Sequence, residues 1–461
     1  MQDEEEESKR LHVGEASNLE KSVAKLTDNA FTLDEVAKTK VQNKIQMPQN
    51  DPALEAFDQL RVREVRATYR HNASAFLAEF QSIAASLEPD ERIKLEVAYT
   101  RDDVELLKAV LSDPQANKIC SLQWTYYGKE DVTPIIPLLV NSCPGLASLD
   151  VGFEYHSAFD FVSSMLEHPS NMIKVLDISP NTKGDLARFF AALGQSKVSA
   201  LALYYSPEFA QGLFEYLAKD LLVRLDVRMD NKQVPSEMMM SLVDCARLAE
   251  LKLAECKFSQ PTAFAHLPKS ITTLTLDSCT FVGGLDWSFL ADSNVRELDL
   301  NYVSGVDGNQ FGNALAVHLR AKGLDKLRFS RCSFVNATLV GGEIGRIKRL
   351  EIDGHLSDAS FAQIALALLS PNSEMKELVL EYAASIKDHL VSALKHPNCN
   401  LAKLSLPAFA EHRGVALRVE SMFRNRLALF VLLQGRQLRR LYCPLRRLPV
   451  EMLRLVGQVL L

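Results

Sequence analysis

The sequence has no apolar run that approaches the ~18 consecutive residues a helix needs to cross a bilayer. The longest apolar candidate, LALFVLL at Leu427–Leu433, is short and lies between Arg426 and Arg436, which favours a buried helix. The chain opens on MQDEEEESKR, which is acidic where a secretory signal peptide has a positively charged region. We therefore expect neither a membrane span nor a cleaved leader.

Motifs of nucleotide, zinc and thiol chemistry are missing as well. The chain contains no G-x-x-x-x-G-K-[ST], no C-x-x-C and no H-E-x-x-H, which are the patterns that hold a phosphate, exchange a disulfide or bind zinc. His318 and His389 fall on expected helices, and a single histidine there is typical of structure rather than of a reaction. We predict a non-enzymatic protein with no catalytic residue, no cofactor and no metal site.

The overall charge is mildly acidic and cysteine is sparse. The 52 Lys and Arg residues against 58 Asp and Glu residues give a formal net charge of −6, which argues against nucleic-acid binding by the whole chain. Eight cysteines in 461 residues is ordinary usage, and we expect reduced, structural thiols rather than a disulfide network. These features predict a cytoplasmic protein.

Three segments of the chain share one eleven-residue pattern: LAELKLAECKF from Leu248, ITTLTLDSCTF from Ile271 and LDKLRFSRCSF from Leu324. Each is apolar at its first, fourth and sixth positions, and each has Cys ninth and Phe eleventh, which matches the leucine-rich-repeat signature. The fourth and sixth residues of a strand lie on one face and enter the core. We expect the ninth side chains to form a ladder of buried thiols made of Cys256, Cys279 and Cys332.

The apolar part of this pattern recurs in twelve units. Their fourth positions are Leu122, Leu149, Leu176, Leu201, Leu225, Leu251, Leu274, Leu298, Leu327, Leu350, Leu378 and Leu404. Successive fourth positions are 23 to 29 residues apart, the spacing of leucine-rich repeats. Most connecting segments have the apolar spacing of a helix. Only those after Cys256 and Cys332 are too short, and there we expect a helical turn at most.

Strand and helix that alternate in this way predict an α/β solenoid of the leucine-rich-repeat type. Its parallel strands would line the inside of a horseshoe and its helices the outside. The repeats resemble the ribonuclease-inhibitor-like class, and SALKHPNCNLAKLSL at Ser392–Leu406 is similar to the helix-to-strand junctions of that class. The resemblance implies a solenoid over residues 118–410. Some proteins of the class are GTPase-activating proteins, and some bacterial effectors carry such repeats.

The regions before and after the repeats have a different composition. Residues 1–50 are polar, with a run of acids at Glu4–Glu7, and predict a disordered acidic tail. Residues 51–117 begin with Asp51-Pro52 and then show helical apolar spacing, so we interpret them as a helical N-terminal cap over the first repeat. Residues 411–461 are rich in arginine and predict helices that end the solenoid.

The inward, solvent-facing positions of the units form the candidate binding face. Aromatic anchors dominate binding energy at interfaces, and a row of carboxylates favours a basic partner. We therefore predict that a protein partner, basic in character, binds this face. The predicted contact residues are Asp150, Phe153, Asp177, Tyr204, Tyr205, Asp226, Asp299, Tyr302, Arg328, Glu351 and Tyr382. Tyr126 belongs to the same set of inward aromatics.

The arginine-rich end offers a second candidate surface, for an acidic partner. The tail PLRRLPVEMLRLVGQVLL from Pro444 resembles the opening helix of an F-box or the closing part of a suppressor-of-cytokine-signalling box. That resemblance implies recruitment of a ubiquitin-ligase scaffold. The same segment can also serve as a cap, with Leu448, Met452 and Leu455 packed against the solenoid.

The sequence thus predicts a protein-interaction scaffold that uses its inner face. Three alternatives stay open: a substrate receptor for a ubiquitin ligase, a GTPase-activating-type repeat protein, and a secreted bacterial effector that acts in the host cytoplasm.

Overall fold

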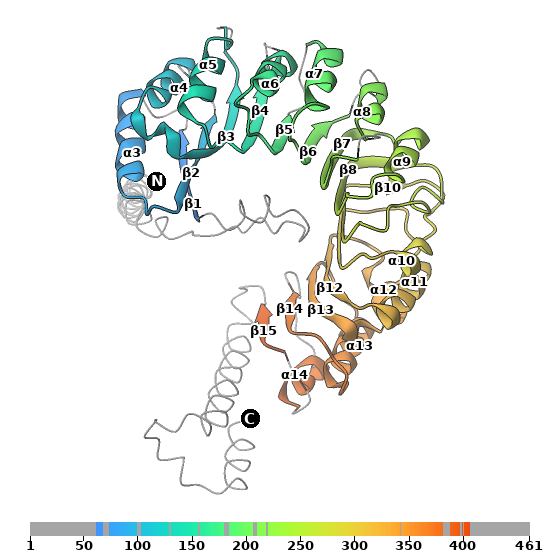
Figure 1. Cartoon of the computed structure of the whole chain (residues 1–461). Helices are drawn as coiled ribbons and strands as arrows, with labels where there is room; N and C mark the ends of the chain where they lie inside the picture. The colour runs from blue at the N-terminus through green and yellow to red at the C-terminus, as the bar shows by residue number, and fades with distance from the viewer. Residues whose placement is uncertain are drawn as a thin grey trace, which may run out of the picture.

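The computed structural model of the chain describes residues 61–67, 73–98, 103–128, 131–154, 157–178, 184–205, 210–217, 220–341, 343–380, 388–396, 399 and 401–405. The predicted acidic tail at 1–50 and the arginine-rich segment at 411–461 lie outside these residues, as does Tyr382. The described residues form one curved body with strands on its inner side and helices on its outer side (Figure 1).

Fourteen strands follow one another in chain order to form a parallel sheet, and β10 adds a short pair to β8. The strands are β1 (Arg61–Ala67), β2 (Glu91–Ala98), β3 (Ile119–Tyr126), β4 (Ser148–Phe153), β5 (Val175–Ile178), β6 (Ala200–Tyr204), β7 (Arg224–Gln233), β8 (Glu250–Phe258), β9 (Thr273–Asp277), β10 (Thr280–Phe281), β11 (Glu297–Asn301), β12 (Leu324–Ser330), β13 (Ile347–Asp353), β14 (Glu377–Leu380) and β15 (Lys403–Ser405). Consecutive strands are neighbours throughout, which is the topology of a solenoid.

The register of the strands confirms the predicted repeat. Each fourth-position leucine is aligned with the next, as Leu251 is with Leu274 and Leu274 with Leu298. The same alignment runs from Leu122 to Leu404 without a break. Leu274 and Leu378 are fully buried, as are most other members of this column. The apolar triplets are therefore the inner strands of one continuous coil.

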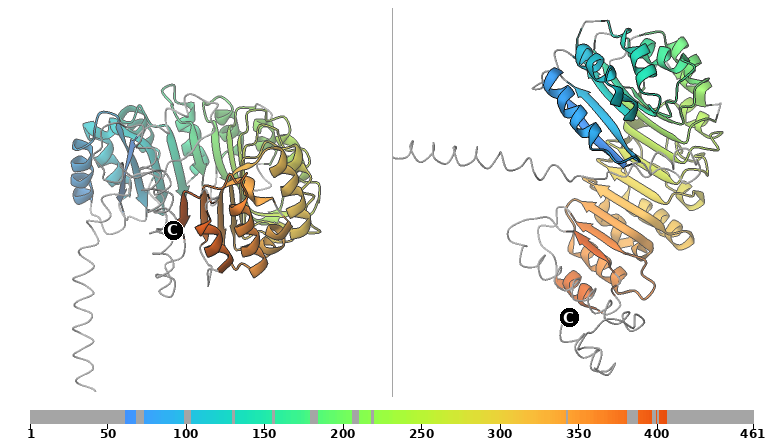
Figure 2. Two further views of the ribbon diagram at one scale, coloured as in Figure 1. Left: turned by 90° about the horizontal axis from the view of Figure 1, so that it is seen from below. Right: turned by 60° about the vertical axis from the view of Figure 1, so that its left-hand side comes forward.

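Helices cover the convex side of the sheet (Figures 1 and 2). They are α3 (Ala73–Ala85), α4 (Asp103–Leu111), α5 (Ile135–Ser142), α6 (Ala158–Glu167), α7 (Leu186–Leu193), α8 (Ala210–Leu217), α9 (Ser236–Leu242), α10 (Phe289–Asp292), α11 (Gly308–Ala321), α12 (Val335–Gly341), α13 (Asp358–Leu369) and α14 (Asp388–Lys395), with 3-10 turns η3 (Pro114–Lys118) and η5 (Ile344–Arg346). Several begin where a side chain accepts a backbone N–H: Ser157 caps α6, Asp185 caps α7 and Ser357 caps α13. Such caps satisfy N–H groups that the first turn leaves open. No described helix is long and apolar enough to cross a membrane.

The prediction of an all-helical cap at 51–117 is wrong for its described residues. Two strands, β1 and β2, lie there and extend the sheet by two units before β3. In β2 the side chains of Ile93, Leu95 and Val97 are fully buried, and Leu95 is aligned with Leu122. Apolar residues that alternate with polar ones have the period of a strand. The alternation of Ile93, Leu95 and Val97 therefore indicates a strand, which the helical prediction did not take into account. The helical spacing of this segment is confirmed by α3, which lies between the two strands, and by α4, which follows β2.

The helical layer thins in the middle of the solenoid. Residues 259–267 after β8 form turns without a helix, as the short spacer predicted, and α10 in the following unit has only four residues. The strands are longer there instead: β7 reaches Gln233 and pairs a second time with β8 beyond a shift in register. After Cys332 the helix α12 has seven residues, more than the single turn expected.

The predicted ladder of ninth-position residues is present and is interrupted once. Cys256, Cys279 and Cys332 are all buried, and Val303, buried at the same position of the intervening unit, separates the last from the other two. The thiol of Cys279 donates to the carbonyl oxygen of Leu253 in the preceding unit at 3.3 Å. These side chains hold the turn that follows each strand.

Replacing Gly308 by Ala is expected to destabilise the C-terminal half of the solenoid. A methyl group at Gly308 would lie 2.7 Å from the carbonyl oxygen of Phe334 and 2.8 Å from the Cβ of Ala337, so α11 and α12 would have to move apart. Overpacking of this kind costs about 1–3 kcal/mol. Chemical denaturation measures the loss; Asn313→Ala, on the exposed side of α11, is the control, and an equal effect of both changes would contradict the close contact.

Candidate functional site

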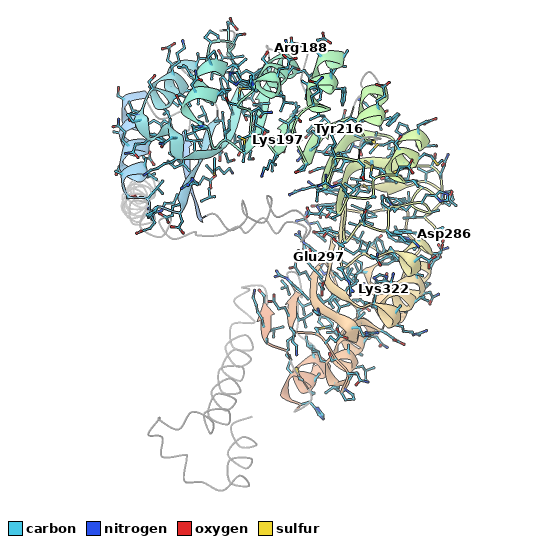
Figure 3. All side chains as sticks on the ribbon, in the orientation of Figure 1. Arg188, Lys197, Tyr216, Asp286, Glu297 and Lys322 are labelled. Atoms are coloured by element: carbon cyan, nitrogen blue, oxygen red, sulfur yellow. The ribbon has the colours of Figure 1, made fainter. Side chains whose placement is uncertain are left out.

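The inner face of the sheet is formed by the third, fifth and seventh residues of each unit. Figure 3 shows Glu297 of β11 on this inner side and Arg188 of α7 on the outer side. Of the predicted contact residues, Asp150, Asp177, Tyr204, Asp299, Arg328 and Glu351 are partly exposed there, Tyr302 is exposed, and Asp226 is buried. The strand register places the fifth-position side chains in one row across the sheet.

Three aromatic residues predicted to face solvent are in the core. Tyr126, Phe153 and Tyr205 are 2%, 2% and 6% exposed. In the first two units the eighth residue is the last residue of the strand, and its side chain packs into the core. Trp124 and Phe153 make an edge-to-face contact there, with ring centroids 5.0 Å apart. The prediction of Phe153 and Tyr205 as contact residues is therefore wrong, because neither is accessible to a partner.

Among the described units, the eighth residue takes a left-handed conformation in four consecutive middle units. Glu255, Ser278, Tyr302 and Arg331 have φ between 49° and 55°, a left-handed conformation that is unfavourable for residues with a Cβ. This turn places the Tyr302 ring at the rim with 47% of its surface exposed. The guanidinium of Arg331 stacks on it, 5.2 Å from the ring centroid, and also bonds the phenol oxygen.

The ring of the predicted contact residue Tyr204 is covered by Arg228, a residue that the sequence pattern did not indicate. Arg228 of β7 is aligned with Tyr204 of β6, lies 5.3 Å from the ring centroid and donates to the phenol oxygen at 3.3 Å. A cation over an aromatic face is stabilised by the negative charge of the π cloud. The pairing depends on register, so sequence spacing alone did not reveal it.

Charges on the C-terminal half of the inner face neutralise one another. Arg328 lies 3.4 Å from Asp299 on one side and 3.5 Å from Glu351 on the other. Arg349 continues the series by pairing with Glu351 at 2.5 Å and with Glu377 at 3.2 Å. Burial raises the pKa of Asp299 and the neighbouring Arg328 opposes the rise. We call this set of ion pairs from Asp299 to Lys403 the charge lattice; it leaves little unbalanced charge for a partner.

The N-terminal half of the face differs, because two adjacent carboxylates there have no partner among the described residues. Asp150 of β4 is aligned with Asp177 of β5, and neither has an ion pair or hydrogen bond with any residue that the structure describes. Their fifth-position neighbours in the row, Gln123 and Ala202, carry no charge. We call Asp150 and Asp177 the carboxylate pair.

The surroundings of the carboxylate pair oppose its ionisation. Burial, together with the negative charge of Asp177, raises the pKa of Asp150 from 3.8 to about 7. Burial likewise raises the pKa of Asp177, and Arg228 opposes that rise without forming a contact. A largely buried carboxylate without a partner destabilises the folded protein. A role in binding therefore explains the carboxylate pair better than a role in stability.

Asp226, the next carboxylate in the row, is neutralised within the chain. Its Oδ2 accepts a hydrogen bond from Lys252 at 2.8 Å and lies 3.7 Å from Arg228. Only 4% of Asp226 is exposed, so it supports Lys252 and Arg228 and does not itself present charge. Of the predicted carboxylates at Asp150, Asp177 and Asp226, only the carboxylate pair therefore lacks a partner among the described residues.

No group of three His, Cys, Asp or Glu side chains among the described residues is arranged to hold a metal ion. Burial raises the pKa of Cys143 to about 12 and that of Cys120 to about 11, which keeps both thiols protonated. A protonated buried thiol is a poor nucleophile.

Comparisons with known proteins assign no family to the chain. No protein-family model and no curated protein matches the chain. Among solved structures, the chain is similar to an internalin from Listeria monocytogenes with 13% sequence identity and a TM-score of 0.36, over 72% of this chain and 88% of that one. At that identity and TM-score the likeness carries no functional argument.

Proposed function

We propose that this chain is a non-enzymatic protein-interaction scaffold that binds a basic segment of a partner protein on the N-terminal half of its inner face. The observation that carries the proposal is the carboxylate pair, because two aligned, largely buried carboxylates without a partner among the described residues lower the stability of the free protein. A lysine or arginine side chain supplied by a partner would restore the missing interaction.

Two further features support this assignment. Solenoids present extended concave surfaces to their partners, and the row of fifth-position side chains is held rigidly by the sheet. Tyr204, beside the carboxylate pair and already stacked with Arg228, adds an aromatic surface of the kind that dominates interface energetics. The charge lattice in the C-terminal half is expected to contribute less, since its groups already satisfy one another.

The finer predictions from the sequence stay proposals. Membership of the ribonuclease-inhibitor-like class is favoured by the long helices α11 and α13 and not by the thin helical layer around β8 to β10. The seven described cysteines are free and buried, in line with a reducing, cytoplasmic location. The ubiquitin-ligase alternative depends on residues 411–461, outside the described part. No observation on the described residues favours a GTPase-activating protein or a secreted effector.

Binding of basic peptides tests the proposed function. We expect decapeptides rich in arginine and lysine to bind the intact protein by calorimetry, and the Asp150→Asn/Asp177→Asn variant to bind them roughly tenfold or more weakly, as for the loss of a close charge pair. Asp244→Asn, an exposed carboxylate after α9, is the matched control and should leave affinity unchanged.

The same variants serve in affinity capture from cell extracts. The intact protein and the Asp244→Asn control are expected to retain one common set of proteins, and the double variant to lose its basic members. If the double variant binds the peptides and retains the same proteins as the intact chain, the carboxylate pair is not the binding site.

A further inference from the structure

His318 occupies an unusual position in the core that the proposed function does not use. It lies on α11, is fully buried, and both of its ring nitrogens face backbone carbonyl oxygens. Nδ1 is 2.7 Å from the oxygen of Leu290 and Nε2 is 2.9 Å from the oxygen of Val295. Leu290 belongs to α10, and Val295 stands just before β11, so the ring bridges both ends of the segment 290–296.

The chemistry of imidazole makes these two contacts depend on protonation. A neutral imidazole has one N–H donor and one acceptor nitrogen, whereas an imidazolium has two donors. A carbonyl oxygen is only an acceptor. The neutral ring therefore bonds one of the two carbonyl groups and presents a lone pair to the other, and only the charged ring bonds both.

Lys322 at the C-cap of α11 and Arg296 provide further contacts between this helix and the segment 290–296. The ammonium of Lys322, labelled in Figure 3, donates to the carbonyl oxygen of Ser293 and, at 3.2 Å, to the side-chain oxygen of Asn294. Arg296 donates in return to the carbonyl oxygen of Lys322 at 2.7 Å. These bonds do not involve the ring of His318, so proton uptake by His318 changes one contact among several between α11 and the segment.

The charged groups around His318 are mostly basic. Asp292 lies on α10, Arg296 on the segment, Arg320 on α11, Lys322 at the C-cap of α11, and Glu343 and Arg346 at η5, while α12 has no charged residue. Arg320 is paired with Glu343, and Arg346 with Glu374. Burial lowers the pKa of His318, Lys322 and Arg296 lower it further, and the two carbonyl groups oppose the change.

We propose that His318 is a proton-operated latch: the neutral ring ties α11 to one end of the segment 290–296, and the protonated ring ties it to both. The segment leads directly into β11, which carries Asp299 of the charge lattice and ends next to Tyr302. Proton uptake therefore adds a hydrogen bond that restrains the segment before β11 and, with it, the start of this part of the inner face. This inference is independent of the carboxylate pair and of any partner.

Protonation of His318 affects the free energy of unfolding of the whole protein differently from the local contact. Because the pKa of His318 is lower in the folded protein than in the unfolded chain, the unfolded chain binds this proton more tightly. The contribution of His318 to the free energy of unfolding is therefore present above the ordinary histidine pKa and is lost as the pH falls below it. The latch concerns openings of the segment 290–296 in which the ring stays buried and loses a carbonyl contact that raises its pKa. In those openings protonation favours the closed segment, and the effect is measured under conditions where the protein stays folded.

Nuclear magnetic resonance of the intact protein tests the latch directly. We expect the ring of His318 to show one N–H at neutral pH and two at acid pH, with a titration midpoint below that of an exposed histidine. Hydrogen exchange of the amides at 291–297, corrected for the chemical rate, should slow by roughly three- to tenfold as the ring is protonated, the effect of one additional hydrogen bond.

Two variants separate the latch from a general effect of pH. His318→Gln has a side chain that does not titrate and should abolish the pH dependence of exchange at 291–297, while His266→Gln, an exposed histidine, should keep it. The proposal is overturned by a ring that never acquires a second N–H, or by the same pH response in His318→Gln and the intact protein. If His318→Gln does not fold, the ring titration of the intact protein decides alone.

Discussion

Leu274→Ala is expected to lower the free energy of unfolding by about 2–5 kcal/mol, the range for truncating a packed leucine. Leu274 is fully buried and lies in register between Leu251 and Leu298, so the change opens a cavity inside the stacked column. The position is sensitive because the helical layer is thin here: neither the turn after β8 nor the short α10 can move in to fill the space. Chemical denaturation with a circular-dichroism readout measures the loss.

The control for Leu274→Ala is its neighbour in sequence. Thr275→Ala changes the next side chain on β9, which faces the inner surface and is partly exposed, and should change stability by less than about 1 kcal/mol. Solenoid stability is a sum over units and their interfaces, so a broadened transition in Leu274→Ala would also be consistent with a weakened central unit. A loss no larger than that of Thr275→Ala would contradict the stacked column.

Asp150→Asn is expected to raise stability at pH 8 while it weakens binding of a basic partner. The pKa of Asp150 is raised from 3.8 to about 7 in the folded protein, so the folded state holds this proton more tightly than the unfolded chain does. By linkage, the free energy of unfolding falls as the pH rises from about 4 to about 7, and this loss is absent from Asp150→Asn. The difference of 7 − 3.8 = 3.2 units sets an upper limit of about 4 kcal/mol.

Solvent reaches part of the Asp150 side chain, so we expect a gain of about 2 kcal/mol at pH 8 and none at pH 4. Denaturation midpoints for Asp150→Asn and the intact protein, measured across this pH range, give the comparison. Asp244→Asn serves again as the exposed control and should follow the intact protein. Parallel curves for Asp150→Asn and the intact protein would show that burial does not oppose ionisation of Asp150.

A gain in stability together with a loss of binding would distinguish a functional residue from a structural one. Structural carboxylates such as Glu351, between Arg328 and Arg349, are expected to destabilise the protein when neutralised, because their cations lose a partner. Residues that are kept despite a stability cost are characteristic of functional sites. Neutralising a carboxylate is therefore expected to raise the free energy of unfolding in the N-terminal half of the inner face and to lower it in the C-terminal half.

The sequence by itself determined the repeat architecture. An apolar triplet that recurs every 23 to 29 residues leaves few ways to bury its fourth and sixth side chains, and stacked parallel strands satisfy all twelve units at once. The strands β1 and β2 were available from the same logic, through the alternation of Ile93, Leu95 and Val97. The helical spacing of the neighbouring segments, which form α3 and α4, hides these two strands in the sequence pattern.

Only the tertiary structure decided which residues of the inner face are accessible and which charges are balanced. Tyr205 and Tyr302 occupy the same position of their units, yet one is buried and the other exposed, because of the two only Tyr302 has a left-handed backbone conformation. The carboxylates of Asp150 and Asp299 occupy equivalent positions too, and register gives Asp299 an arginine on the next strand while Asp150 receives Asp177. Burial and pairing depend on neighbours that lie a whole unit away along the chain, so local pattern does not contain them.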